Sequence, residues 1–69
     1  MELNFDQYID AYMEQGFKLV KDLQEGDSRS ATLRLYTADE YGEVMLREKN
    51  GTKKVSIMQS MNGKVVFTQ

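Results

Sequence analysis

The sequence predicts an α+β fold in which one N-terminal amphipathic helix packs across one face of a four-stranded antiparallel β-meander. Two observations predict it. An apolar stripe at helical spacing runs through the first third of the chain, and the remainder alternates apolar and polar residues between turn-forming dipeptides. The connections between the expected strands are too short for crossovers, so consecutive strands should be antiparallel neighbours in a single domain, residues 1–69.

The helix is expected over residues 5–25. Asn4 is a suitable N-cap, and Gln7 completes a capping box with it. Apolar residues recur at helical spacing at Phe5, Tyr8, Ile9, Tyr12, Met13, Leu19, Val20 and Leu23. Gly16 falls at the centre of this stripe, where it costs up to about 1 kcal/mol relative to Ala. We favour one continuous helix that approaches the sheet closely at Gly16 and ends with Gly26 as its left-handed cap; the alternative is a kink at Gly16 that divides the segment.

Four strands are expected after the helix, over residues 31–37, 43–49, 52–60 and 64–69. The strongest signal among them is Asn50-Gly51, because both residues tolerate the positive φ that a type I′ turn requires. A two-residue turn at this point sets Lys49 opposite Thr52 and, further out, Leu46 opposite Val55. The residues that this turn places beneath the helix are Val44, Leu46, Val55 and Ile57.

Asn62-Gly63 connects the third expected strand to the fourth and leaves two registers open. A two-residue turn pairs Met58 with Phe67 and Ser60 with Val65, which sends these apolar groups to the face away from the helix. A three-residue loop with a glycine bulge instead turns Val65 and Phe67 inward. The choice decides how apolar the face away from the helix is.

The composition excludes several kinds of site. Cysteine and histidine are both absent, so the chain has no disulfide, no thiolate or imidazole metal site and no Cys–His or Ser–His catalytic pair. We expect no cofactor, no metal and no enzymatic activity, because carboxylates and lysines alone would have to act in a domain too small for much of a buried pocket. The sequence shows neither a basic segment followed by an apolar leader nor a run of about eighteen apolar residues. A cytoplasmic protein with no membrane partner is therefore expected.

The charge is unevenly distributed, although the net charge is only −2. Residues 1–27 hold seven of the eleven acidic residues but only two of the nine basic ones, Lys18 and Lys21. The expected helix is thus acidic and the expected strands are basic. This polarity is compatible with nucleic acid, with an acidic protein partner or with attraction between helix and sheet.

The candidate protein interface is the sheet face away from the helix. On the two-residue register its residues are Tyr36, Met45, Arg47, Lys54, Met58 and Phe67. One helix covers only one face of such a sheet, and Met and aromatic side chains suit adaptable contacts. The alternative is that the other register leaves only scattered Met and Tyr residues on this face.

The same face can also serve as a platform for single-stranded nucleic acid, with Tyr36 and Phe67 stacking on bases and the basic residues meeting phosphates. We rank this use second. Glu43 and Glu48 lie among the bases, and the sequence contains no RNP-like aromatic motif.

A secondary acidic contact is expected from two further segments. These are Asp39, Glu40 and Tyr41 in a turn, and Asp10 and Glu14 on the helix. A row of helical carboxylates can mimic phosphates and occupy a basic groove on a nucleic-acid-handling protein, although a charge row is more commonly a solvated helix face. The acidic turn lacks the ligand spacing of a calcium loop and is expected to be a hydrated turn or a protein contact.

These features predict a non-enzymatic protein-binding module, a small intracellular inhibitor or regulator that occludes a partner's surface. In size, acidity and lack of catalytic groups the chain is similar to the small single-domain inhibitors that phages and mobile elements encode, a similarity of type that covers no motif. The expected partner is another protein, including one that handles nucleic acid. A homodimer formed through the sheet face is compatible with either function.

Overall fold

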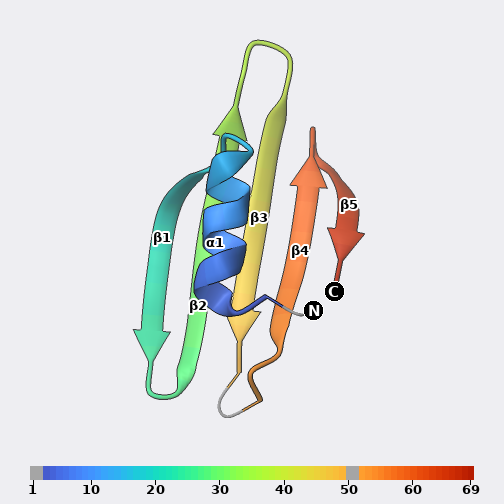
Figure 1. Ribbon diagram of the computed structural model, residues 1–69. Coiled ribbons are helices and arrows are strands. Elements are labelled where there is room, and N and C mark those ends of the chain that lie inside the picture. Colours follow the sequence, from blue (N-terminus) through green and yellow to red (C-terminus); the bar gives the residue numbers. More distant parts are fainter. Residues whose placement is uncertain (1–2, 50–51) are drawn as a thin grey trace.

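The computed structural model describes residues 3–49 and 52–69 and shows one helix and a five-stranded sheet in this part of the chain (Figure 1). In chain order the elements are α1 (Phe5–Glu14), β1 (Lys18–Glu25), β2 (Ser28–Tyr36), β3 (Tyr41–Glu48), β4 (Val55–Met61) and β5 (Lys64–Thr68). The strands lie in the order β1-β2-β3-β4-β5, and each neighbouring pair is antiparallel. The α+β class is confirmed, whereas the prediction of four strands is wrong.

The predicted helix over residues 5–25 is too long, because the chain leaves the helix at Gly16. The N–H of Gly16 donates to the carbonyl of Met13 (3.0 Å), and the N–H of Phe17 donates to that of Tyr12 (3.1 Å). These two bonds form a Schellman motif, which needs a left-handed residue, and Gly16 has a φ of +101°. The rings of Tyr12 and Phe17 pack edge to face with centroids 5.6 Å apart, which is the apolar contact that accompanies this motif. Gly16 therefore divides the segment, as the alternative expected, but it ends the helix instead of forming a kink within it.

The second half of the predicted helix is β1, an edge strand whose residues are all exposed. A bulge at Val20 interrupts its pairing with β2. Gly26 has a φ of +58°, as expected of a left-handed cap, but it occupies the two-residue turn between β1 and β2. Asp22 and Glu25, which the predicted helix over residues 5–25 included, consequently lie in a strand.

The pairing of β3 with β4 is offset by two residues from the prediction. The N–H of Thr52 donates to the carbonyl of Lys49 (3.2 Å), as a turn at this point requires, but the turn residues Asn50-Gly51 lie outside the described residues. Lys53 then adopts a φ of +56°, and regular pairing resumes only with Val55 opposite Glu48. An offset of two keeps the paired side chains of β3 and β4 on their predicted face. The four residues predicted beneath the helix are all buried: Val44, Leu46, Val55 and Ile57.

The last strand combines both of the registers that the sequence left open. Next to the turn at residues 62–63, which both have positive φ, Ser60 pairs with Val65 as a two-residue turn predicts. A one-residue bulge then shifts the register, so that Phe67 lies opposite Gln59. Val65 therefore points away from the helix and Phe67 points to the helix side. The other strand bounds differ from the predicted ones by at most three residues.

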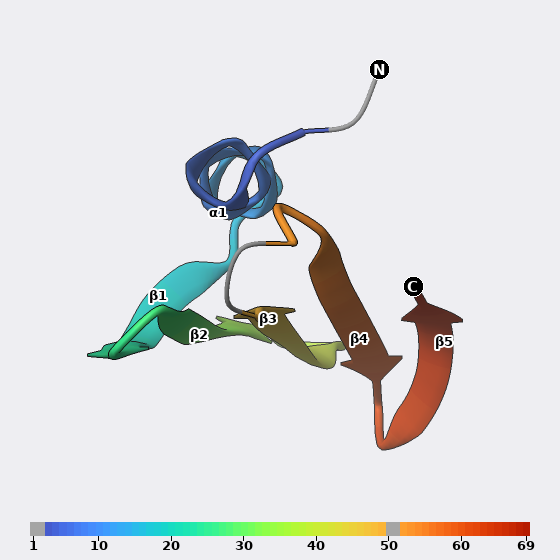
Figure 2. The ribbon, with the colours of Figure 1, turned by 90° about the horizontal axis from the view of Figure 1, so that it is seen from below.

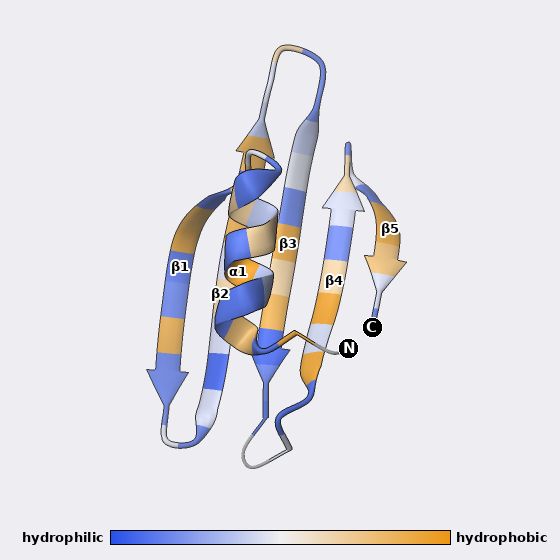
Figure 3. Ribbon diagram, in the orientation of Figure 1, coloured by the Kyte–Doolittle hydropathy of each residue, from blue (hydrophilic) through white to orange (hydrophobic). Residues whose placement is uncertain are grey.

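Ten buried residues between α1 and the sheet form the core: Phe5, Ile9, Tyr12, Phe17, Ala31, Leu33, Val44, Leu46, Val55 and Ile57. Figure 2 shows α1 above one face of the sheet, while β4 and β5 curl up beside it. Figure 3 shows a continuous apolar stretch in the middle of β3, because the exposed Met45 lies between the buried Val44 and Leu46. The capping box at the start of α1 is present, with Asn4 and Gln7 joined by two hydrogen bonds of 2.9 Å.

The one helix in the described part of the chain has ten residues, and no helix there is long and apolar enough to cross a membrane.

Candidate functional site

The sheet face opposite α1, which we call the outer face, is the candidate site. Side chains alternate along each strand, so the residues that flank the buried positions point to this face. Its middle is formed by Thr32 of β2, Met45 of β3 and Met58 of β4, which lie directly opposite one another across the three central strands. Met45 and Met58 are 41% and 40% exposed, so the centre of the outer face is apolar and open to solvent.

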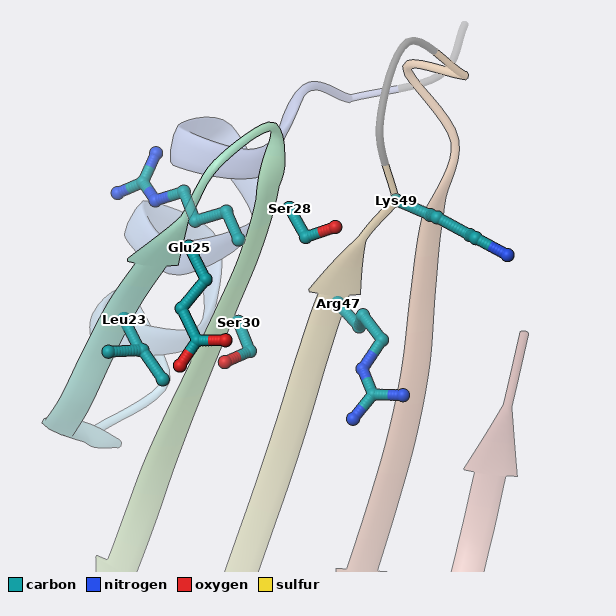
Figure 4. A pocket seen from close by; sticks show the side chains of 7 residues that line it. Leu23, Glu25, Ser28, Ser30, Arg47 and Lys49 are labelled. Carbon is teal, nitrogen blue, oxygen red and sulfur yellow. The ribbon is translucent and has the colours of Figure 1, made fainter.

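A second row of the outer face runs beside the methionine row and is polar. It consists of Leu23, Ser30, Arg47 and Ser56, one residue from each of four successive strands. Two depressions of about 380 Å³ each flank this row. One lies over Met45 and Met58, the other lies at the end of the sheet near Lys49, and Arg47 and Ser30 line both. Figure 4 shows Ser30, Arg47 and Lys49 projecting from the same side of the sheet.

A third row contains an ion pair. Arg34 of β2 lies opposite Glu43 of β3, and its Nε donates to the Glu43 carboxylate over 3.0 Å. This hydrogen bond raises the pKa of Arg34 above its ordinary value. The guanidinium and the carboxylate therefore largely neutralise each other.

Two tyrosines form the far end of the outer face. Tyr36 and Tyr41 lie opposite each other at the ends of β2 and β3, with ring centroids 5.0 Å apart. The nearby Tyr36 raises the pKa of the Tyr41 hydroxyl, and desolvation adds to this effect. Because the two rings pack against each other with their planes tilted by 50°, they form one aromatic surface rather than two separate platforms.

The outer face is positively charged although the chain is acidic. The register places five basic side chains on it, Lys18, Lys21, Arg34, Arg47 and Lys49, against the two acidic side chains Glu25 and Glu43. The carboxylates of α1 lie on the other side of the sheet. The separation of charge expected between helix and strands therefore becomes a separation between the two faces of the molecule.

The structure brings together four of the six residues predicted for the interface: Tyr36, Met45, Arg47 and Met58. It does not place the other two with them. Lys54 precedes β4 in the connection from β3, and it lines a hollow with Leu3 and Tyr8 at the helix side of the molecule. Phe67 faces the helix side because of the bulge in β5.

The predicted acidic contact is divided among three places. Asp39 and Glu40 lie in the loop between β2 and β3, where both backbone N–H groups donate to the hydroxyl of Thr37 (3.3 and 2.9 Å). Asp10 and Glu14 are exposed on α1, whereas Tyr41 belongs to the outer face. These residues form no common surface. Within residues 3–49 and 52–69 no group of three or more acidic side chains is gathered for a metal ion.

The sequence reasoning missed the contribution of β1 and of the small hydroxyl residues. Lys21 and Leu23 reach the outer face only because residues 18–25 form a strand, whereas the sequence predicts that both belong to a helix over residues 5–25. Ser30 and Ser56 were missed because a serine in a strand carries no signal by itself. The cross-strand pairing with Arg47 is the signal that identifies them.

Comparison of the chain with protein-family models, with curated proteins and with solved structures finds no match. The function is therefore argued from the outer face.

Proposed function

We propose that this protein is a non-enzymatic protein-binding module, an inhibitor or regulator that docks its outer face on a partner protein and occludes the partner's surface. The observation that carries the proposal is the pair of half-exposed methionines, Met45 and Met58, at the centre of a face that α1 leaves uncovered. Methionine is enriched at the centres of interfaces because its flexible side chain adapts to the surface that it meets.

The arrangement of the outer face supports this proposal. An apolar centre is surrounded by the hydroxyl groups of Thr32 and Ser56 and by basic side chains, which is the usual pattern of an interface core with a polar rim. The molecule measures 39 by 20 Å along its two longer axes. A face of this size is of the same order as the roughly 800 Å² that each partner buries in a standard protein complex.

The charge of the outer face indicates the kind of partner. Lys21 and Arg47 line the depression over the methionine pair, and Lys49 lines the neighbouring depression, where Glu25 is the one acidic side chain. An acidic protein surface is therefore complementary to this face. Such complementarity accelerates the encounter and discriminates between partners more than it adds to affinity. We propose a partner that presents apolar side chains bordered by Asp and Glu.

Single-stranded nucleic acid is the second candidate, and the basic and hydroxyl groups around Arg47 favour it. The aromatic residues do not favour it. Phe67, expected to stack on bases, faces the other side of the sheet. The rings of Tyr36 and Tyr41 pack against each other at the far end of the outer face, away from Arg47. We rank this function below protein binding for that reason.

Site-specific photo-crosslinking in the native host tests the proposal. A benzophenone amino acid replaces Met45 in one variant and Asp10 of α1 in another, and adducts are identified by mass spectrometry. The expected result is one protein captured from position 45 and absent from position 10, since Asp10 lies on the opposite side of the molecule. An adduct between two copies of the chain would instead identify a homodimer formed through the outer face.

Binding of the captured partner is then measured by calorimetry for two matched variants. Met58→Ser should weaken binding by at least tenfold, whereas Phe67→Ser should change it by less than about twofold. The two residues are 40% and 43% exposed, so the variants remove similar exposed groups from opposite faces. Equal effects of the two substitutions, with both variants folded by circular dichroism, would contradict docking through the outer face.

A further inference from the structure

The three arginines of the chain are used differently. Arg29 binds Asp6 and Asp22, at 2.9 and 2.8 Å. Arg34 binds Glu43 at 3.0 Å. Arg47 has no ion pair with any side chain in residues 3–49 and 52–69, and it is exposed on the outer face.

The strand register explains why Arg47 is left without a carboxylate. The residue opposite Arg34 on β3 is Glu43, whereas the residues opposite Arg47 are Ser30 on β2 and Ser56 on β4. Directly opposite side chains in a sheet have Cβ atoms only about 5 Å apart. Arg47 is therefore flanked on both sides by hydroxyl groups, which donate hydrogen bonds but do not neutralise its charge.

The nearest acidic side chain of the depression does not fill this role. Glu25 belongs to β1, two strands away from Arg47, and neighbouring strands are about 4.8 Å apart. Figure 4 shows Glu25 and Arg47 on either side of Ser30. Between them the depression is open, and Lys49 adds a second positive charge two residues further along β3.

We propose that Arg47, with the hydroxyl groups of Ser30 and Ser56, is the binding site for an Asp or Glu side chain of the partner protein. This inference rests on the proposed function, since it specifies how the partner is recognised by the same face. A guanidinium binds a carboxylate through two parallel hydrogen bonds, and the flanking hydroxyls can donate to its remaining lone pairs. The adjacent methionine pair accommodates an apolar neighbour of that acidic residue.

A carboxylate fits this site better than the phosphates of a nucleic acid. A nucleic-acid strand needs a continuous track of free cations along its backbone together with stacking surfaces for its bases. Lys21 and Lys49 line the depressions beside Arg47, but no aromatic side chain of the described residues lines either depression. The next arginine, Arg34, is paired with Glu43, and Glu25 lines the other end of the depression. One unpaired guanidinium beside an apolar patch matches a single acidic side chain with an apolar neighbour.

NMR titration of the full chain labelled with ¹⁵N tests the site. The probe is the blocked peptide acetyl-Glu-Leu-Glu-Leu-Glu-Leu-amide, and the same peptide with Gln in place of Glu is the neutral control. The expected result is a saturable shift of the Arg47 side-chain Nε–H and of the Ser30 and Ser56 amides with the acidic peptide, and a much weaker response to the neutral one. Arg47→Gln should lower the affinity for the acidic peptide about tenfold.

Lys64→Gln is the matched control because it removes the same charge at the start of β5, away from Arg47. It should change the affinity by less than about twofold. An equal loss in the Lys64→Gln and Arg47→Gln variants would mean general attraction of anions and would overturn the site. Tighter binding of hexathymidylate than of the acidic peptide at Arg47 would overturn it in favour of nucleic acid.

The failure of this inference can be distinguished from the failure of the proposed function. If Met58→Ser weakens binding of the crosslinked partner and Arg47→Gln does not, the outer face docks a protein but Arg47 does not select its acidic side chain. If neither substitution weakens that binding, docking through the outer face is itself wrong.

Discussion

The guanidinium of Arg29 holds the carboxylate of Asp22 through two hydrogen bonds, 3.1 Å from Nε and 2.8 Å from Nη2. Asp22 belongs to the exposed edge strand β1 and Arg29 to β2, so the pair fastens this edge to the rest of the sheet. Arg29 also binds Asp6 of α1 and lies 4.5 Å from the centre of the Phe5 ring. One side chain therefore connects the edge strand, its neighbour and the first turn of the helix.

This pair predicts a pH-dependent contribution to stability. The hydrogen bonds from Arg29 hold the pKa of Asp22 below its ordinary value of 3.8. The ionised carboxylate therefore stabilises the fold fully above about pH 4, and this contribution is lost as the pH falls through the lowered pKa. Asp22→Asn should lower the free energy of unfolding at pH 7 by about 1 kcal/mol, and by much less at pH 2, as measured by urea denaturation.

Asp10→Asn is the control, because it removes the same charge from an exposed position of α1 that has no ion pair within the described residues. It should leave the free energy of unfolding unchanged within about 0.5 kcal/mol at pH 7. A difference between Asp22→Asn and the unmodified chain that stays constant from pH 7 to pH 2 would show that the ion pair does not stabilise the fold.

A substitution at Gly16 distinguishes the structure from the helix that the sequence predicts. In a continuous helix over residues 5–25, Gly16→Ala would stabilise the protein by up to about 1 kcal/mol. In the structure Gly16 has a φ of +101°, and an added Cβ would lie 3.3 Å from Cδ1 of Leu35. Gly16→Ala should therefore lower the free energy of unfolding by about 1–3 kcal/mol, measured by urea denaturation.

Gly26→Ala provides the comparison for this measurement. Gly26 also has a positive φ, +58°, but an added Cβ meets nothing within 4 Å. Its substitution should cost only the backbone strain, about 1 kcal/mol. A stabilising Gly16→Ala substitution would contradict the Schellman motif.

The fold was predictable from the sequence wherever a pattern was compatible with one secondary structure only. The alternation around residues 44–57 assigned the side chains of β3 and β4 to the correct face even though the register was two residues off, since the extra residues Lys53 and Lys54 come as a pair. The segment after Gly16 was compatible both with the period of about 3.6 residues of a helix and with the period of two residues of a strand. Leu19, Val20 and Leu23 continue the helical stripe, and the bulge at Val20 interrupts the alternation that would have identified a strand.

The residues of the candidate site were predictable only where the strand that carries them was predicted with the correct face outward. Met45, Arg47 and Met58 were assigned to the outer face by the central hairpin. Phe67 was also assigned to the outer face, and this was wrong, because a one-residue bulge reverses the direction of every side chain beyond it. No residue type in β5 requires that bulge. The unpaired state of Arg47 depends on what lies opposite it in two other strands, so it follows from the register and not from the local sequence.

Adjacent residues in β3 give the most direct test of which side of the sheet is the core. Leu46 is 1% exposed beneath α1, whereas Met45 is 41% exposed on the outer face. Leu46→Ala should lower the free energy of unfolding by about 2–5 kcal/mol, which approaches the whole stability of a domain of this size. Met45→Ala should lower it by less than about 1 kcal/mol, because the side chain is not enclosed by the core.

Thermal and urea denaturation of the two variants check this difference. If Met45→Ala were as destabilising as Leu46→Ala, the outer face would be packed against something in the isolated protein and would not be free to dock on a partner. The expected order, with Leu46 structural and Met45 nearly neutral, is also what a docking surface requires. Its residues must be replaceable without loss of the fold for their effect on binding to be measured separately.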